Sequence, residues 1–235
     1  MKRKNFKYFF WFVLFCLAVF FIAKVSGPRL LKIYIDSGMG DCSKIPILCM
    51  APSQDINNPE INKEFLAGLM PKKFPKITIF SPKGFAVVQE LIKKPYYKAK
   101  RNRYKDSVIY ILHLEKNYFP NLYPQVKGIG INDNYGFISR LMDAKSIDIK
   151  GIDDAFFIIM KSIFIPDLGD QKWVVMARFS MPKHKGFISY NIFGKQHYFD
   201  CNMVTQNGDF YKVYIKDKSG VLDLSEAFTI ISTVE

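Results

Sequence analysis

The longest apolar stretch of the chain runs from Phe9 to Ala23, fifteen residues without a charge. Counted from Tyr8, sixteen apolar residues make a helix of roughly 24 Å, slightly short of a ~30 Å hydrocarbon core. Val25 extends the stretch if Lys24 reaches up to the lipid headgroups. A helix packed on a soluble core would have a polar face, and this one has none. The pattern predicts a basic tail at 1–7 and a single transmembrane anchor at 8–25.

A cleaved secretory signal is the main alternative, because basic residues precede the apolar run. Its cleavage position is poor: only Val25 and Gly27 approach the small residues required, and the cut would leave Pro28 as the first residue. A buried helix of a soluble protein is a third interpretation. Basic residues are slightly more numerous before the run than after it, which favours a cytoplasmic N-terminus, an extracytoplasmic domain and a single pass. The reverse topology stays open.

The rest of the chain shows the periodicities of one globular domain. Residues 26–56 have little periodicity and are predicted to form a juxtamembrane linker, and 57–235 are predicted to form an extracytoplasmic domain. Apolar positions at helical spacing predict helices at 57–70, 133–144 and 152–165. The last of these is apolar on nearly all sides, so it is expected in the middle of the core, and a buried strand is the alternative. Alternating patterns predict strands at 76–80, 84–92 and 107–115 and four more between 172 and 217, and 224–233 fits a helix or a last strand.

This order of elements predicts the fold class. Helix, strands, helices and then an antiparallel meander indicate an α+β fold, with helices packed on one face of a curved antiparallel sheet. The dipeptide Asn207-Gly208 predicts a two-residue type I′ hairpin that pairs Thr205 with Phe210 and Met203 with Lys212. A Ser-Pro-Lys turn is expected to join strands 76–80 and 84–92.

The net charge of +13 is concentrated in two places. Residues 1–32 carry seven Lys or Arg and no acid, residues 93–105 carry another seven and no acid, and the remainder sums to −1. This distribution argues against a broad nucleic-acid surface. The 93–105 segment mixes bases with tyrosines, which suits an anionic envelope polymer, lipid headgroups or an acidic protein. A solvated hairpin loop is the alternative. The candidate residues are Lys93, Lys94, Tyr96, Tyr97, Lys98, Lys100, Arg101, Arg103, Tyr104 and Lys105.

The cysteines offer two possible sites. Cys42 and Cys49 are a C-x6-C pair that can form a disulfide outside the cytoplasm, although two unpaired thiols are the alternative. Cys201 lies near His197 and Asp200, which suggests a nucleophile, but on a strand Asp200 points to the other face, so a buried structural cysteine is favoured. The histidines lack metal-ligand spacing, and no cofactor is expected.

These observations favour a membrane-anchored, extracytoplasmic binding or assembly module rather than an enzyme. Its basic, tyrosine-rich segment would contact an anionic partner. Two alternatives stay open: an envelope enzyme of unrecognised type, and a cytoplasm-facing anchored domain that contacts nucleic acid or anionic lipid. Oligomeric state has no signature in the sequence.

Overall fold

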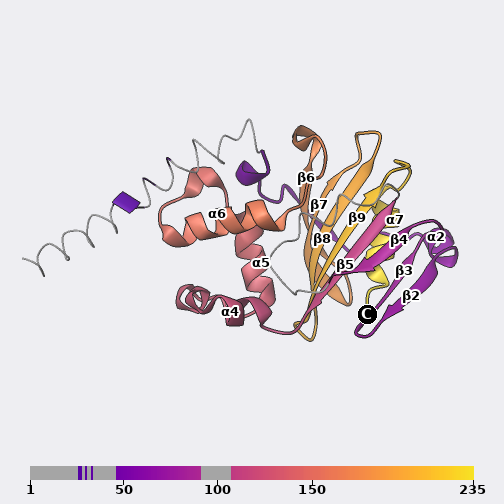
Figure 1. Cartoon of the computed structure of the whole chain (residues 1–235), viewed down its shortest axis with the longest axis horizontal. Coiled ribbons are helices and arrows are strands. Elements are labelled where there is room, and N and C mark those ends of the chain that lie inside the picture. Colours follow the sequence, from indigo (N-terminus) through magenta and orange to yellow (C-terminus); the bar gives the residue numbers. More distant parts are fainter. Residues whose placement is uncertain (1–25, 28–29, 31–32, 34–45, 91–106) are drawn as a thin grey trace, which may run out of the picture.

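The computed structural model describes residues 46–90 and 107–235, together with residues 26, 27, 30 and 33. Its centre is a seven-stranded sheet in the order β1-β6-β7-β8-β9-β5-β4, and a separately hydrogen-bonded two-stranded sheet, β2-β3, packs on one of its faces (Figure 1). The strands are β1 (Gln54–Asn57), β2 (Met70–Phe74), β3 (Ile77–Ser81), β4 (Ala86–Gln89), β5 (Val108–Leu114), β6 (Val175–Ser180), β7 (His184–Asn191), β8 (His197–Thr205) and β9 (Phe210–Asp217).

Strand pairing in the large sheet is mixed. Strands β6 to β9 pair antiparallel in chain order, and β9 pairs antiparallel with β5. Both edges are parallel: β1 pairs with β6 and β4 pairs with β5. The predicted antiparallel sheet is therefore wrong at its edges, because each edge strand pairs with a strand to which no short turn connects it.

Both faces of the sheet are covered. The first face carries η2 (Pro46–Cys49), α4 (Tyr118–Leu122), η3 (Pro124–Ile129), α5 (Asn134–Asp143), η4 (Ser146–Asp148) and α6 (Ile152–Phe164). The second face carries α2 (Lys63–Ala67), the β2-β3 hairpin and α7 (Leu224–Ser232), as Figure 1 shows. The prediction of helices on one face only is wrong, because alternate residues of the central strands are apolar on both sides. Cys201 and Met203, for example, face the α7 layer and are fully buried.

The helix layer on the first face has an aromatic core. The Phe119 ring stacks on Phe137 with centroids 4.6 Å apart, and Phe210 of β9 meets Phe119 edge-on at 5.1 Å. Helix α5 begins where Asp133 caps it, its carboxylate accepting from Gly136 N at 2.6 Å. Helix α6 packs beside α5 but is not central: Ile152 and Ile163 are 61% and 55% exposed. Its outer apolar face lies at the surface, contrary to the expectation from sequence.

The β8-β9 hairpin forms one residue out of the predicted register. Val204 pairs with Phe210, so Asn202, not Met203, lies opposite Lys212. Gly208 has φ +89°, and Thr205 N donates to Asp209 O at 2.9 Å, so the turn is wider than the two-residue type. Because side chains alternate along a strand, this single step puts Lys212 on the first face of the sheet, where its ammonium donates to Phe164 O of α6 at 2.8 Å.

Strand β4 also has an unexpected partner. Strand β3 pairs with β2, while β4 runs parallel to β5, with Ala86 opposite Val108 and Gln89 opposite Ile111. Parallel strands do not form a hairpin, so the hairpin pairing of the two strands that flank residues 91–106 is wrong.

Residues predicted as linker include part of the fold. Leu48 of η2 is fully buried, and β1 extends the sheet at its β6 edge. The predicted anchor at 8–25 lies outside the described residues. Within the part of the chain that the structure describes, no helix has the length and apolar character needed to cross a membrane.

Candidate functional site

Several connections converge at one end of the large sheet, which we call the loop end. They are η2, η4, η5 (Gln171–Trp173), the β7-β8 turn at 192–196 and the β9-α7 turn at 218–222. Element η2 packs against both η4 and η5. In Figure 1 these connections lie along the upper edge of the molecule, opposite the β8-β9 turn. Because the strands end here, this edge presents side chains from segments far apart in the sequence.

Backbone contacts hold two of these connections together. Gly220, at φ +64°, has an ideal Cβ position only 2.7 Å from Lys195 O, so a side chain there would separate the two turns. The His197 Nδ1 atom is 2.6 Å from Leu222 O. The β7-β8 and β9-α7 turns therefore form one surface.

Asp217, at the end of β9, organises the second of these turns. Its carboxylate accepts from Val221 N and Leu222 N at 2.8 and 2.9 Å, and from Ser219 N at 2.9 Å. Burial alone would raise the pKa of Asp217, but the hydrogen bonds from Ser219, Leu222 and Val221 outweigh it and hold the pKa below its usual range. Ser107 Oγ also donates to Asp217, at 3.2 Å. The start of β5 is thereby attached to the loop end.

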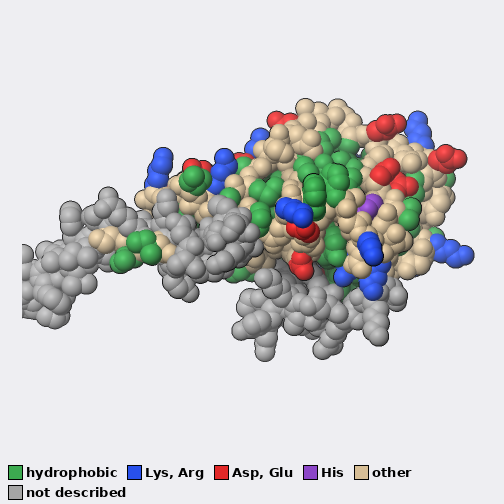
Figure 2. All heavy atoms as spheres, turned by 90° about the horizontal axis from the view of Figure 1, so that it is seen from above, with side chains coloured by type: hydrophobic (Ala, Val, Ile, Leu, Met, Phe, Trp, Pro, Cys, Tyr) green, Lys and Arg blue, Asp and Glu red, His purple; other side chains and the backbone are tan. Residues whose placement is uncertain are grey.

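Large apolar side chains are exposed along the loop end. Trp173 is 49% exposed and Phe193 63%, and their ring centroids lie 5.6 Å apart. Val221 in the β9-α7 turn and Ile147 in η4 are 73% and 70% exposed. Lys172 Nζ lies 5.4 Å from the centre of the Trp173 ring. Figure 2 looks onto this end, where hydrophobic side chains gather with Lys and Arg side chains around them and acidic groups among these.

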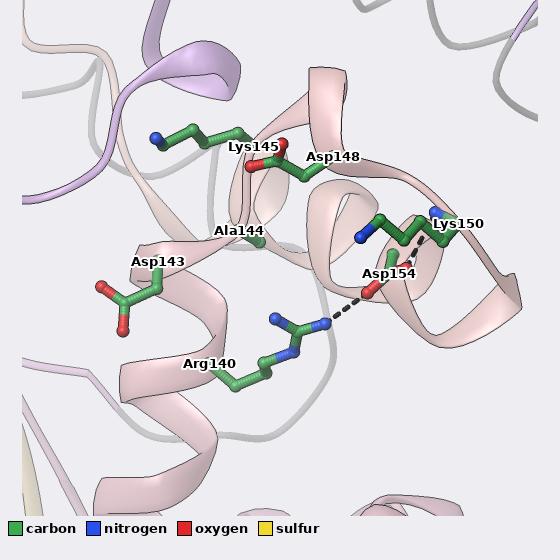
Figure 3. A pocket seen from close by; sticks show the side chains of 7 residues that line it. All are labelled: Arg140, Asp143, Ala144, Lys145, Asp148, Lys150 and Asp154. Carbon is green, nitrogen blue, oxygen red and sulfur yellow. Dashed lines mark hydrogen bonds and ion pairs between the residues drawn. The ribbon is translucent and has the colours of Figure 1, made fainter.

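A charged depression lies between α5, η4 and the start of α6 (Figure 3). Two of its charges are satisfied by each other: Arg140 forms an ion pair with Asp154, whose other oxygen accepts from Lys150 N and Gly151 N at 2.9 and 3.1 Å. Asp143 accepts from Arg178 of β6 at 3.2 Å. The seven lining residues are Arg140, Asp143, Ala144, Lys145, Asp148, Lys150 and Asp154.

The depression can hold a small charged group but not a large ligand. Its volume is about 200 Å³, whereas sites for drug-sized molecules usually exceed ~300 Å³ and are mostly apolar. With the two pairs set aside, Lys145, Lys150 and Asp148 remain among its lining charges. An anion such as a phosphate or carboxylate group is the chemistry that two ammonium groups and one carboxylate favour.

A buried lysine contacts the backbone of Ala144, one of the residues that line the depression. Lys161 of α6 is 0% exposed, and its ammonium donates to the carbonyls of Met50, Met142 and Ala144 at 2.5, 2.8 and 2.8 Å. Burial lowers the pKa of Lys161 to about 7, against a smaller opposing effect of Asp143. Met142 is in the last turn of α5 and Ala144 is its C-cap, so Lys161 fastens the end of α5 to the residues that follow η2.

The predicted anionic-partner residues of segment 93–105 all lie outside the described residues. Both neighbours of the segment are described: β4 ends at Gln89, and β5 is preceded by Ser107 at the loop end. Cys49 is disulfide-bonded, and its sulfur accepts from Ser146 Oγ at 3.0 Å. Cys42, its predicted partner, lies outside the described residues, so this pairing stays a prediction.

The alternative catalytic residues are not brought together. Asp200 and Cys201 are both fully buried on opposite faces of β8, and burial raises the pKa of the Cys201 thiol well above its usual value. Asp200 pairs with Lys212 at 2.9 Å, on the first face of the sheet. Within the described ranges, no group of three or more His, Cys, Asp or Glu side chains is placed to hold a metal ion. A cleft with a Cys201 nucleophile is therefore not formed.

No family model matches this chain, and no curated protein is significantly similar to it. The sequence did not predict the loop end, because Trp173 and Phe193 were assigned to predicted strands, whereas the structure places them in η5 and in the β7-β8 turn.

Proposed function

We propose that this chain is a membrane-attached binding or assembly module. Its apolar segment at 8–25 would hold the domain at a bilayer, outside the cytoplasm, and its basic segment at 93–105 would contact an anionic partner. One observation carries the proposal: both strongly basic parts of the chain lead into the loop end. The N-terminal part leads into η2 at Pro46, and the 93–105 segment leads into Ser107.

Charge favours an anionic partner at this end. In the proposed topology, Lys24, Arg29 and Lys32 lie on the same side of the bilayer as the 93–105 segment, which carries seven Lys or Arg and no acid. These positive charges repel one another when they are brought near the same surface. A polyanion relieves that repulsion and releases its own counterions on binding, which makes its affinity depend steeply on salt.

Charge reversal in the basic segment tests the partner. The full chain in non-ionic detergent would be titrated against fluorescent heparin, a general polyanion, at several salt concentrations. The triple variant K98E/R101E/R103E should bind more weakly, and the slope of log affinity against log salt should fall by about one for each lost contact. The control K63E/K72E/K127E makes the same charge change on exposed described residues. Equal losses in both variants would show only net charge, and the proposal would be rejected.

Membrane attachment and sidedness need a separate test. Lys127 lies in η3 and is exposed, so K127C places a thiol away from the loop end. The full chain should float with membranes, and a membrane-impermeant thiol reagent should label K127C in intact cells. Recovery in the soluble fraction would refute attachment, and labelling only after lysis would refute the outward topology.

A further inference from the structure

The loop end exposes large apolar side chains, and an anionic partner bound by the basic segment does not explain their exposure. Trp173, Phe193 and Val221 are about half exposed or more, although they come from three connections that pack together. Large contiguous apolar surfaces on a soluble face are uncommon and mark contact sites. The partner must therefore offer apolar contacts as well as anionic ones.

Lysines surround these apolar side chains. Lys195 is exposed in the same turn as Phe193, and Lys218 lies three residues before Val221. Lys172 lies over the Trp173 ring and is also paired with Asp170 at 3.1 Å. Asp148 and Asp167 add acidic charge near by, so this end is mixed rather than uniformly basic.

This combination matches the headgroup region of a bilayer. Trp, Phe and aliphatic side chains that project from loops favour the boundary between headgroups and acyl chains, while neighbouring lysines meet anionic lipid. Each basic residue near an anionic surface contributes enough to shift a docking equilibrium about fivefold. A protein partner would not explain why the chain from the N-terminal apolar segment also reaches the fold at this end.

We propose that the loop end docks on the surface of an anionic bilayer, with Trp173 and Phe193 at headgroup depth and Lys195 and Lys218 on lipid phosphates. Ile147 in η4 extends the same surface, since η4 packs on η2 and η2 on η5. This inference rests on the proposed membrane attachment and adds the orientation of the domain and the class of ligand. The β8-β9 turn and α4 would then point away from the membrane.

Trp173 can report this contact directly. The chain has two tryptophans, Trp11 and Trp173, so W11F leaves Trp173 as the only one. Full-length W11F would be reconstituted into vesicles of phosphatidylcholine with or without phosphatidylglycerol. Lipids labelled with a quencher near the carbonyl groups, and iodide in the water, measure on which side of the headgroups the ring lies.

Docking predicts that lipid quenchers reduce Trp173 emission in phosphatidylglycerol vesicles and that iodide does so weakly. On the same background, F193S/K195E should cut the lipid quenching severalfold. The control L122S/K127E makes the same chemical change on exposed residues of α4 and η3, away from the loop end, and should leave the quenching unchanged. Circular dichroism would check that each variant is folded.

Two results would overturn the inference. If Trp173 stays open to iodide while the protein floats with the vesicles, attachment holds but docking fails. If lipid quenching is equal with and without phosphatidylglycerol, anionic lipid is not the ligand. Failure to float at all would instead reject the proposed function.

Discussion

Replacing Lys161 with methionine should make the stability of the protein less dependent on pH. Lys161 is fully buried, and its ammonium is held by three backbone carbonyls at 2.5 to 2.8 Å. Burial lowers its pKa from 10.5 to about 7 in the folded state. Between these two pH values the unfolded chain keeps a proton that the folded protein has released. The free energy of unfolding should therefore rise with pH across this window. Below pH 7 the buried ammonium is charged, and it destabilises the folded state by its full amount.

The size of the effect follows from the two pKa values. One pKa unit corresponds to ~1.4 kcal/mol, so the wild-type free energy of unfolding should gain about 2 kcal/mol between pH 7 and 9 from this group. In K161M that gain should be absent. Methionine also leaves three carbonyls without a donor, at a cost of ~1–3 kcal/mol for each that stays unsatisfied. That cost is independent of pH, so the change with pH is the diagnostic quantity.

Urea unfolding of the full chain in non-ionic detergent would measure both quantities, with Trp173 fluorescence on the W11F background at pH 7, 8 and 9. The control K150M removes an exposed lysine near the same depression and should follow the wild-type curve. If the wild-type and K161M curves are parallel, Lys161 does not make the stability depend on pH, and the prediction is wrong. That result would mean that the three carbonyls keep Lys161 protonated despite its burial.

Two further substitutions test the sheet. K212M leaves the buried Asp200 carboxylate without the ammonium 2.9 Å away and should lower the free energy of unfolding by ~3–5 kcal/mol. The double variant D200N/K212M should recover at least ~1 kcal/mol of that loss. Equal urea midpoints for the two variants would contradict a coupled pair. G186A places a Cβ 2.1 Å from Asn202 O of the neighbouring strand β8 and should lower the free energy of unfolding by more than ~2 kcal/mol. The control G128A has open space around it and should leave the stability nearly unchanged. A wild-type midpoint for G186A would show that the two strands adjust.

Helix and strand identities could be predicted where the signal is local. Asp133 caps α5, and its apolar residues recur at helical spacing, so the predicted helix at 133–144 matches Asn134–Asp143 to within a residue at each end. The period-two pattern between 172 and 217 likewise corresponds to strands β6 to β9. These features depend on neighbours within a few residues, which a sequence displays directly.

Register and strand partners could not be predicted in the same way. Asn207-Gly208 fits both a two-residue turn and a wider one, and these differ by one residue of register. The observed register puts Lys212 opposite Asn202 and within reach of Asp200, where its buried charge is paired. The Asn207-Gly208 dipeptide carries no information about the pairing of Lys212 with Asp200, which selects the observed register.

Residue type and spacing alone were enough to predict the distribution of charge, the apolar run at 9–23 and the position of most secondary structure. Tertiary structure decided which strands are parallel, that helices cover both faces, and that Trp173, Phe193 and Val221 share one surface. Strand pairing and the meeting of loops depend on contacts between residues far apart in the chain. The free energy of such contacts comes from packing and burial that only the folded molecule brings about.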